Sequence, residues 1–83
     1  MDAQTLDRDR RTLRLRPEAI DDQLKLHGWS TLTEAARACG LAPSTLARCY
    51  RGEVDPGPYV VAQLLDGTGA PFDQLFAVVV DDA

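Results

Sequence analysis

The sequence predicts an all-α domain of five helices, with short β-strands expected near its two ends, at about residues 12–16 and 77–80. Three observations predict this fold. Prolines or a capping threonine stand where segments with helical apolar spacing begin, glycines stand where they end, and strand-like patterns are confined to the two terminal segments. Because 83 residues can bury one hydrophobic core, we expect a flexible arm at residues 1–11 and a single domain at residues 12–83.

The expected arm alternates acidic residues with arginines and has no apolar period. Its basic residues include Arg8, Arg10 and Arg11. Two interpretations stay open for them, a solubilising tail and an arm that contacts DNA phosphates or the minor groove. The residues that follow, 12–16, alternate polar and apolar side chains with period two, which is typical of a half-buried strand.

A first helix is expected from Pro17 to about His27. Proline fits the first helical position, where its missing N–H leaves no hydrogen bond unmade. Ile20 and Leu24 are spaced at i and i+4 on one face, and Gly28 is a helix stop. His27 stands at the helix end as a surface residue, and we assign it no role.

Thr31 and Glu34 form the pattern of a capping box, which begins a second helix. In such a box the threonine hydroxyl accepts a hydrogen bond from the N–H of Glu34, and the glutamate carboxylate accepts one from the N–H of Thr31. Apolar residues then form one stripe as far as Cys39. Gly40 ends the helix, because glycine adopts a positive φ without a Cβ penalty.

A third helix is expected from about Pro43 to Arg51, closed by Gly52. Only residues 40–42 separate it from the second helix, and so short a connection containing glycine is typical of two helices that cross steeply. Its two faces differ in character. One carries Leu46, Cys49 and Tyr50, and the other carries Ser44, Ala47, Arg48 and Arg51.

The remaining sequence predicts a buried helix, a short helix and a strand. Residues 59–66 are apolar nearly all round, which favours a buried helix, and residues 67–69 are expected to be a loop. Residues 71–76 fit a short fifth helix, and the β-branched residues of 77–80 favour a strand. The two terminal strands could pair within one chain or between subunits.

Charge is unevenly distributed along the chain. The net charge of −4 counts against nucleic-acid binding when taken as a bulk figure. Residues 37–52, however, contain Arg37, Arg48 and Arg51 and no acidic residue. Such segregation can give an acidic molecule a positive face.

Several kinds of chemistry are not expected from this sequence. No histidine or further cysteine stands at ligand spacing from Cys39 or Cys49, so we expect two reduced, buried thiols and no metal or cofactor. No convergent set of His, Cys and carboxylate residues indicates an enzyme, and no small-molecule ligand is expected. The charged N-terminus and the short apolar runs predict no membrane association and a cytoplasmic location.

A resemblance to the Cro/C1-type (XRE family) helix-turn-helix domain of phage repressors, Cro proteins and bacterial regulators is carried by the stretch LTEAARACGLAPSTLARCYRGEVDP. The matching positions are Ala36 and Gly40 at the family's Ala-x-x-x-Gly spacing, Leu41 at the turn, Ser44, Thr45, Leu46 and Arg48 in the recognition helix, and the terminal Arg51-Gly52. The resemblance covers about residues 17–76. It implies a five-helix lambda-repressor-like fold with its helix-turn-helix core at residues 31–52.

The resemblance also implies which residues contact DNA. Base-edge contacts would come from the start and middle of the recognition helix, and phosphate contacts from the start of the second helix and the end of the third. With the arm included, the expected DNA-binding residues are Thr33, Arg37, Pro43, Ser44, Thr45, Ala47, Arg48, Arg51, Arg8, Arg10 and Arg11. Leu32, Ala42 and Tyr50 depart from the family pattern: Leu32 loses a polar contact, and Ala42 weakens the start of the recognition helix because alanine is a poor cap. Pro43 and Ala47 cannot donate side-chain hydrogen bonds, so direct readout is expected to be sparse. Arg48 is therefore the main expected base contact, through guanine O6 and N7.

We expect a sequence-specific transcriptional regulator that occupies a double-stranded DNA operator. A homodimer is expected, either in solution or only on DNA, because such regulators bind two half-sites about 34 Å apart through a two-fold axis. The predicted dimer contacts are Phe76, Val78 and Val80. The alternative function is a protein-interaction module, such as an antitoxin, anti-repressor or assembly factor, that uses the same helices against a protein partner.

Overall fold

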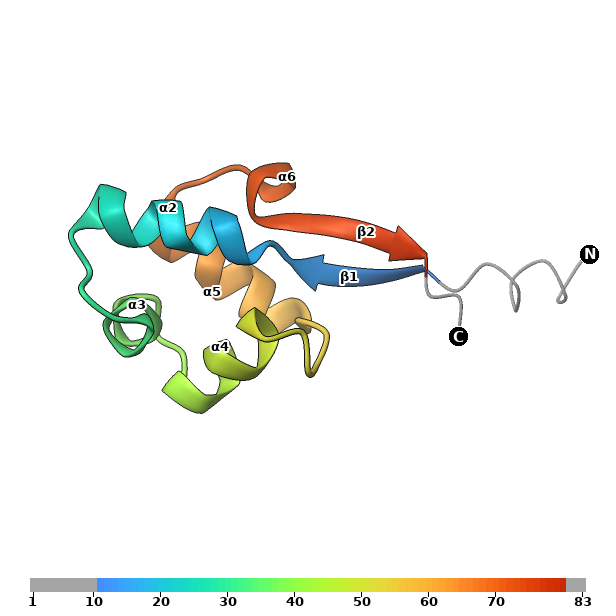
Figure 1. The fold of residues 1–83 in the computed structure, drawn as a ribbon, viewed down its shortest axis with the longest axis horizontal. Coiled ribbons are helices and arrows are strands. Elements are labelled where there is room, and N and C mark those ends of the chain that lie inside the picture. The colour runs from blue at the N-terminus through green and yellow to red at the C-terminus, as the bar shows by residue number, and fades with distance from the viewer. Residues whose placement is uncertain (1–10, 81–83) are drawn as a thin grey trace, which may run out of the picture.

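The computed structural model describes residues 11–80, in which five helices and one two-stranded antiparallel sheet occur (Figure 1). The elements in chain order are β1 (Arg11–Leu15), α2 (Pro17–His27), α3 (Leu32–Ala38), α4 (Pro43–Tyr50), α5 (Pro58–Thr68), α6 (Phe72–Leu75) and β2 (Phe76–Val80). The expected all-α class therefore holds for the body of the domain, and the two terminal strands add a small sheet to it.

The predicted helix starts are confirmed, with one change in the capping box. Proline occupies the first turn of α2, α4 and α5. Thr31 Oγ1 accepts a hydrogen bond from the N–H of Glu34 at 3.1 Å, as predicted. The Glu34 carboxylate, however, accepts from the N–H of Ser30 at 2.8 Å, not from that of Thr31. The box therefore caps α3 and also holds the residue before the cap.

The two strands pair within the chain, which settles the question that the sequence left open. Leu15 stands opposite Phe76, Leu13 opposite Val78 and Arg11 opposite Val80. Each strand begins one residue earlier than expected, so Arg11 belongs to β1 and not to an arm. Figure 1 shows the sheet projecting away from the group of helices formed by α2, α3, α4 and α5.

The last two helices have different bounds from those predicted. α5 continues past residue 66, because the Thr68 hydroxyl donates to the carbonyl of Leu64 at 2.7 Å and Gly69 ends the helix with a φ of 73°. Gly67 therefore lies inside a helix and not in a loop. A Cβ at this position would lie 2.5 Å from Cys39 Sγ, so the missing side chain lets α5 approach the end of α3. α6 ends one residue earlier than expected, because Phe76 is extended.

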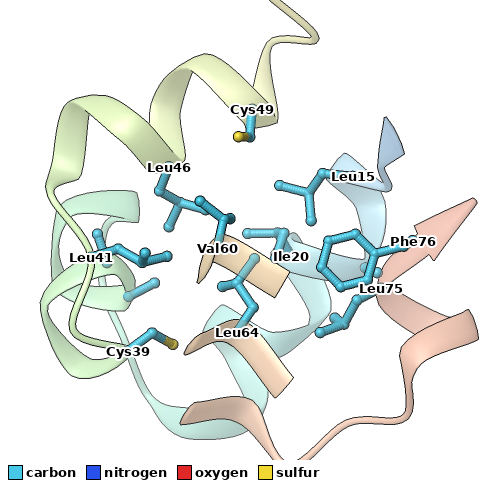
Figure 2. Packing of buried hydrophobic residues seen from close by; sticks show 13 residues of the cluster. Leu15, Ile20, Cys39, Leu41, Leu46, Cys49, Val60, Leu64, Leu75 and Phe76 are labelled. Carbon is cyan, nitrogen blue, oxygen red and sulfur yellow. The ribbon is translucent and has the colours of Figure 1, made fainter. Parts of the chain in front are cut away.

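The core contains side chains from all the helices and from the inner end of the sheet (Figure 2). The largest fully buried side chains are Phe76, Ile20, Leu46, Leu64 and Leu75. Cys39 and Cys49 are free and buried, as the sequence predicts. Burial raises the pKa of both thiols, and nearby Asp66 and Asp55 raise those of Cys39 and Cys49 further, so both resist ionisation.

Candidate nucleic-acid interface

The turn between α3 and α4 is built by a small residue, a glycine and a leucine. Ala36 is fully buried where the two helices pack, which allows a close approach of their backbones. Gly40 has a φ of 73°, confirming the predicted left-handed turn. The N–H of Leu41 then donates to the carbonyl of Ala36 at 2.8 Å, and the Leu41 side chain is buried. These bonds end α3 and direct the chain into α4.

Helix α5 fixes the same turn through two side chains. Gln63 Nε2 donates to the carbonyl of Cys39 at 3.0 Å, and the Tyr59 hydroxyl donates to the carbonyl of Gly40 at 3.2 Å. Carbonyls at a helix end have no partner within the helix, so these donors complete their hydrogen bonding. The Gln63 amide also fills the space that a Cβ at Gly40 would need, at 2.6 Å. No local sequence pattern links α5 to residues 39 and 40, so these bonds could not be predicted from the sequence.

Helix α4 presents two different faces. Leu46 and Cys49 are buried on the inner face. Ser44, Arg48 and Arg51 are exposed, while Pro43, Thr45 and Ala47 are half-buried. All six predicted DNA-contacting residues of this segment therefore retain exposed surface. Ala42 occupies the N-cap position before α4 and supplies no side-chain hydrogen bond, as expected of an alanine.

Tyr50 attaches α4 to α2. Its hydroxyl donates to Asp21 Oδ1 at 2.8 Å, and this hydrogen bond is the main reason that its pKa is raised. The ring is half-buried at the edge of the core. The sequence placed Tyr50 on the packing side of the helix but gave no signal for its partner, which lies 29 residues earlier.

Arg37 and Arg48 are the arginines of the helix-turn-helix that keep their charge unpaired. Both are exposed, and among residues 11–80 neither has a carboxylate within ion-pair distance. Thr33 is exposed one turn before Arg37 on α3. The guanidinium groups of α3 and α4 are thus available to an anionic partner.

Arg51, in contrast, is paired with the first acid after the acid-free stretch 37–52. Its Nε lies 2.7 Å from Glu53 Oε2, and its terminal nitrogen donates to the other oxygen of the same carboxylate at 3.4 Å. The hydrogen bond from Arg51 lowers the pKa of Glu53, and the charge of Arg48 lowers it further. Glu53 is therefore held as an anion beside the exposed face of α4.

The remaining predicted site residues have different outcomes. Arg8 and Arg10 lie outside the described residues, and Arg11 is exposed in β1. Phe76 is 1% exposed in the core, so its ring is not a surface contact and the prediction of a dimer contact there is wrong. Val78 and Val80 are 61% and 59% exposed on the same strand, because they extend beyond the helices that cover Phe76.

His27 has neighbours that its position in the sequence did not suggest. Its Nε2 lies 3.1 Å from both Gln23 Oε1 and the carbonyl of Thr68. Both partners are acceptors, so Nε2 carries the proton. The ring also stacks on Trp29 with centroids 4.4 Å apart. His27 thereby joins the C-terminal ends of α2 and α5, and its contacts are structural.

Over residues 11–80 no group of three or more His, Cys, Asp or Glu side chains could hold a metal ion. No helix in that range is long and apolar enough to cross a membrane. Comparisons with protein-family models, curated proteins and solved structures give no match. The function of this chain is therefore inferred from its own residues.

Proposed function

We propose that this chain is a sequence-specific DNA-binding regulator of the Cro or repressor type, with a lambda-repressor-like fold and α4 as its recognition helix. One observation carries the proposal. The exposed face of α4 holds Ser44 and Arg48, and Leu46 and Cys49 anchor its opposite face. Arg48, and Arg37 on the preceding helix, have no ion pair among residues 11–80. An α-helix held in this way fits a major groove about 12 Å wide.

Arg48 is the residue to which we assign base recognition. Its guanidinium can donate two hydrogen bonds to guanine O6 and N7. Pro43 and Ala47 have no side-chain donors, so they would contact bases only through apolar atoms. Arg37 and Thr33 would bind phosphate. With so few direct contacts, DNA shape and half-site spacing would supply much of the specificity.

A homodimer would supply that spacing, and β2 offers the surface for it. Within residues 11–80, β2 pairs on one edge only, with β1, and no charged residue, proline or glycine interrupts its sequence FAVVV. Such an unprotected edge favours pairing with another strand. Val78 and Val80 are its exposed apolar residues. Pairing of two identical antiparallel strands is self-complementary about a two-fold axis.

Steric exclusion of polymerase from an operator in the cytoplasm is the simplest mode of action, and we assign no enzymatic activity or cofactor.

A second candidate function is a protein-interaction module that uses the same helices. The net charge of −4 and the neutralisation of Arg51 by Glu53 favour that candidate, because both weaken attraction to phosphate.

Selection of bound sites from random duplex DNA tests the proposal and would give the operator. On the selected site, Arg48→Ala should weaken binding by about 1–3 kcal/mol and relax the preference at one base pair. Lys25→Ala is the matched control, since Lys25 is an exposed cation of α2. Absence of binding at about 50 mM salt would favour the protein-interaction module, because non-specific DNA affinity is greatest at low salt.

The dimer has a separate test. Val78→Lys should leave the fold intact, because residue 78 is exposed, and should give a monomer by light scattering. A parent chain that is monomeric with and without the operator would exclude the dimer.

A further inference from the structure

The Arg51–Glu53 pair is fixed by the backbone at the end of α4. Gly52 has a φ of 77°, which turns the chain back toward the helix. The N–H of Glu53 then donates to the carbonyl of Arg48 at 2.9 Å, and that of Gly52 donates to Cys49 at 3.1 Å. This turn holds Glu53 over the last turn of α4, where its carboxylate contacts the Arg51 side chain.

The carboxylate occupies the donors that a phosphate would use. Arginine binds carboxylate and phosphate through the same fork of N–H groups, two oxygens facing two nitrogens. Both Glu53 oxygens are engaged here, at 2.7 Å and 3.4 Å. The two side chains are 55% and 51% exposed, so a phosphate can reach the guanidinium once the carboxylate moves away.

The other acid of this loop has a different partner. Asp55 pairs with Arg14 of β1 at 3.1 Å. Arg48 has no ion pair among residues 11–80, although it lies one helical turn from Arg51. Among the exposed cations of α3 and α4, the internal acid therefore acts at Arg51.

We propose that Glu53 is a built-in competitor of DNA phosphate for Arg51, and that it limits the affinity of the helix-turn-helix for DNA. This inference rests on the proposed function. Binding exchanges the Glu53 carboxylate for a phosphate oxygen, so Arg51 adds little net affinity while Glu53 is present. Arg48 forms no ion pair among residues 11–80 and interacts with Glu53 only through charge at longer range, so its N–H donors stay open to DNA.

Glu53→Gln tests this proposal, because it keeps the shape of the side chain and removes its charge. We expect binding about two- to fivefold tighter at low salt, the range of an exposed ion pair. The plot of log K against log salt should steepen by about 0.9, the value for one additional phosphate contact on duplex DNA. Arg51→Ala should weaken binding more in the Glu53→Gln background than in the parent.

Glu18→Gln is the matched control, since Glu18 is an exposed carboxylate of α2 that pairs with Arg16, the residue before that helix. Equal gains from Glu53→Gln and Glu18→Gln, or no coupling between residues 51 and 53, would overturn the proposal while DNA binding by the parent upholds the proposed function. If neither the parent nor Glu53→Gln binds any duplex at low salt, the proposed function fails as well. Thermal denaturation of each variant confirms that it is folded.

Discussion

The helix-turn-helix of α3 and α4 and the sheet of β1 and β2 are supported to different extents. Behind the helix-turn-helix, Ala36 and Leu46 are completely buried, and α5 donates hydrogen bonds to the turn. The sheet is buried only at its inner end, where Leu15 and Phe76 face each other, and Val78 and Val80 beyond them are largely exposed. One region has a core behind one exposed polar face, whereas the other leaves apolar surface uncovered.

This difference indicates how each region responds to substitution. A change in the helix-turn-helix acts first through packing, because its side chains fit against several elements at once. A change in the outer sheet acts on surface and association, because few atoms of the same chain surround it. Three pairs of substitutions test this contrast.

Leu46→Ala should lower the free energy of unfolding by about 2–5 kcal/mol, because it opens a cavity beneath α4. Val78→Ala should change it by less than about 1 kcal/mol at concentrations where the chain is monomeric, because residue 78 is exposed in the single chain. Urea denaturation of the two variants measures both values. Comparable losses would mean that the outer sheet is covered, as in a dimer, and a dilution series would then identify the partner.

Gly67→Ala should destabilise the protein by about 1–3 kcal/mol, although alanine usually stabilises a helix relative to glycine. The added Cβ would lie 2.5 Å from Cys39 Sγ and 2.9 Å from Cys39 Cα. The control is Gly57→Ala at the start of α5, where φ is −83° and nothing lies within 4 Å of a Cβ. A gain of stability in Gly67→Ala by thermal denaturation would contradict the close contact of α3 and α5.

Arg14→Ala and Asp55→Asn should each cost less than about 1 kcal/mol, because the ion pair that joins β1 to the loop after α4 is partly exposed. A double-mutant cycle should give a small favourable coupling that decreases at high salt. A coupling above about 2 kcal/mol would show that the outer sheet is held as firmly as the helix-turn-helix.

The sequence predicts the fold best where the signals are local. Pro17, Pro43 and the Thr31 cap begin helices, and Gly40 ends one with the expected positive φ. Each of these residues acts on its own backbone or on groups three or four residues away, so its effect can be inferred without the tertiary structure.

Features that depend on distant residues were not predicted. Gly67 is a typical loop residue until Cys39 is placed against it, and Phe76 looks like surface until the helices cover it. The partner of Arg51 is only two residues away, yet the pair forms because Gly52 reverses the chain. The sequence indicated an acid-free stretch ending at Gly52, but it did not indicate that the next acid folds back onto that stretch.

The pairing of Arg11 with Val80 also has a kinetic consequence. The contacts of the helix-turn-helix are local, whereas this pair joins residues at the two ends of the described chain. Closing so long a loop costs entropy before its contacts are gained, so we expect the helices to assemble first and the strands to pair late. A substitution such as Leu13→Ala should then accelerate unfolding and leave the folding rate nearly unchanged. The surface proposed for self-association would therefore be the last to form and the first to open.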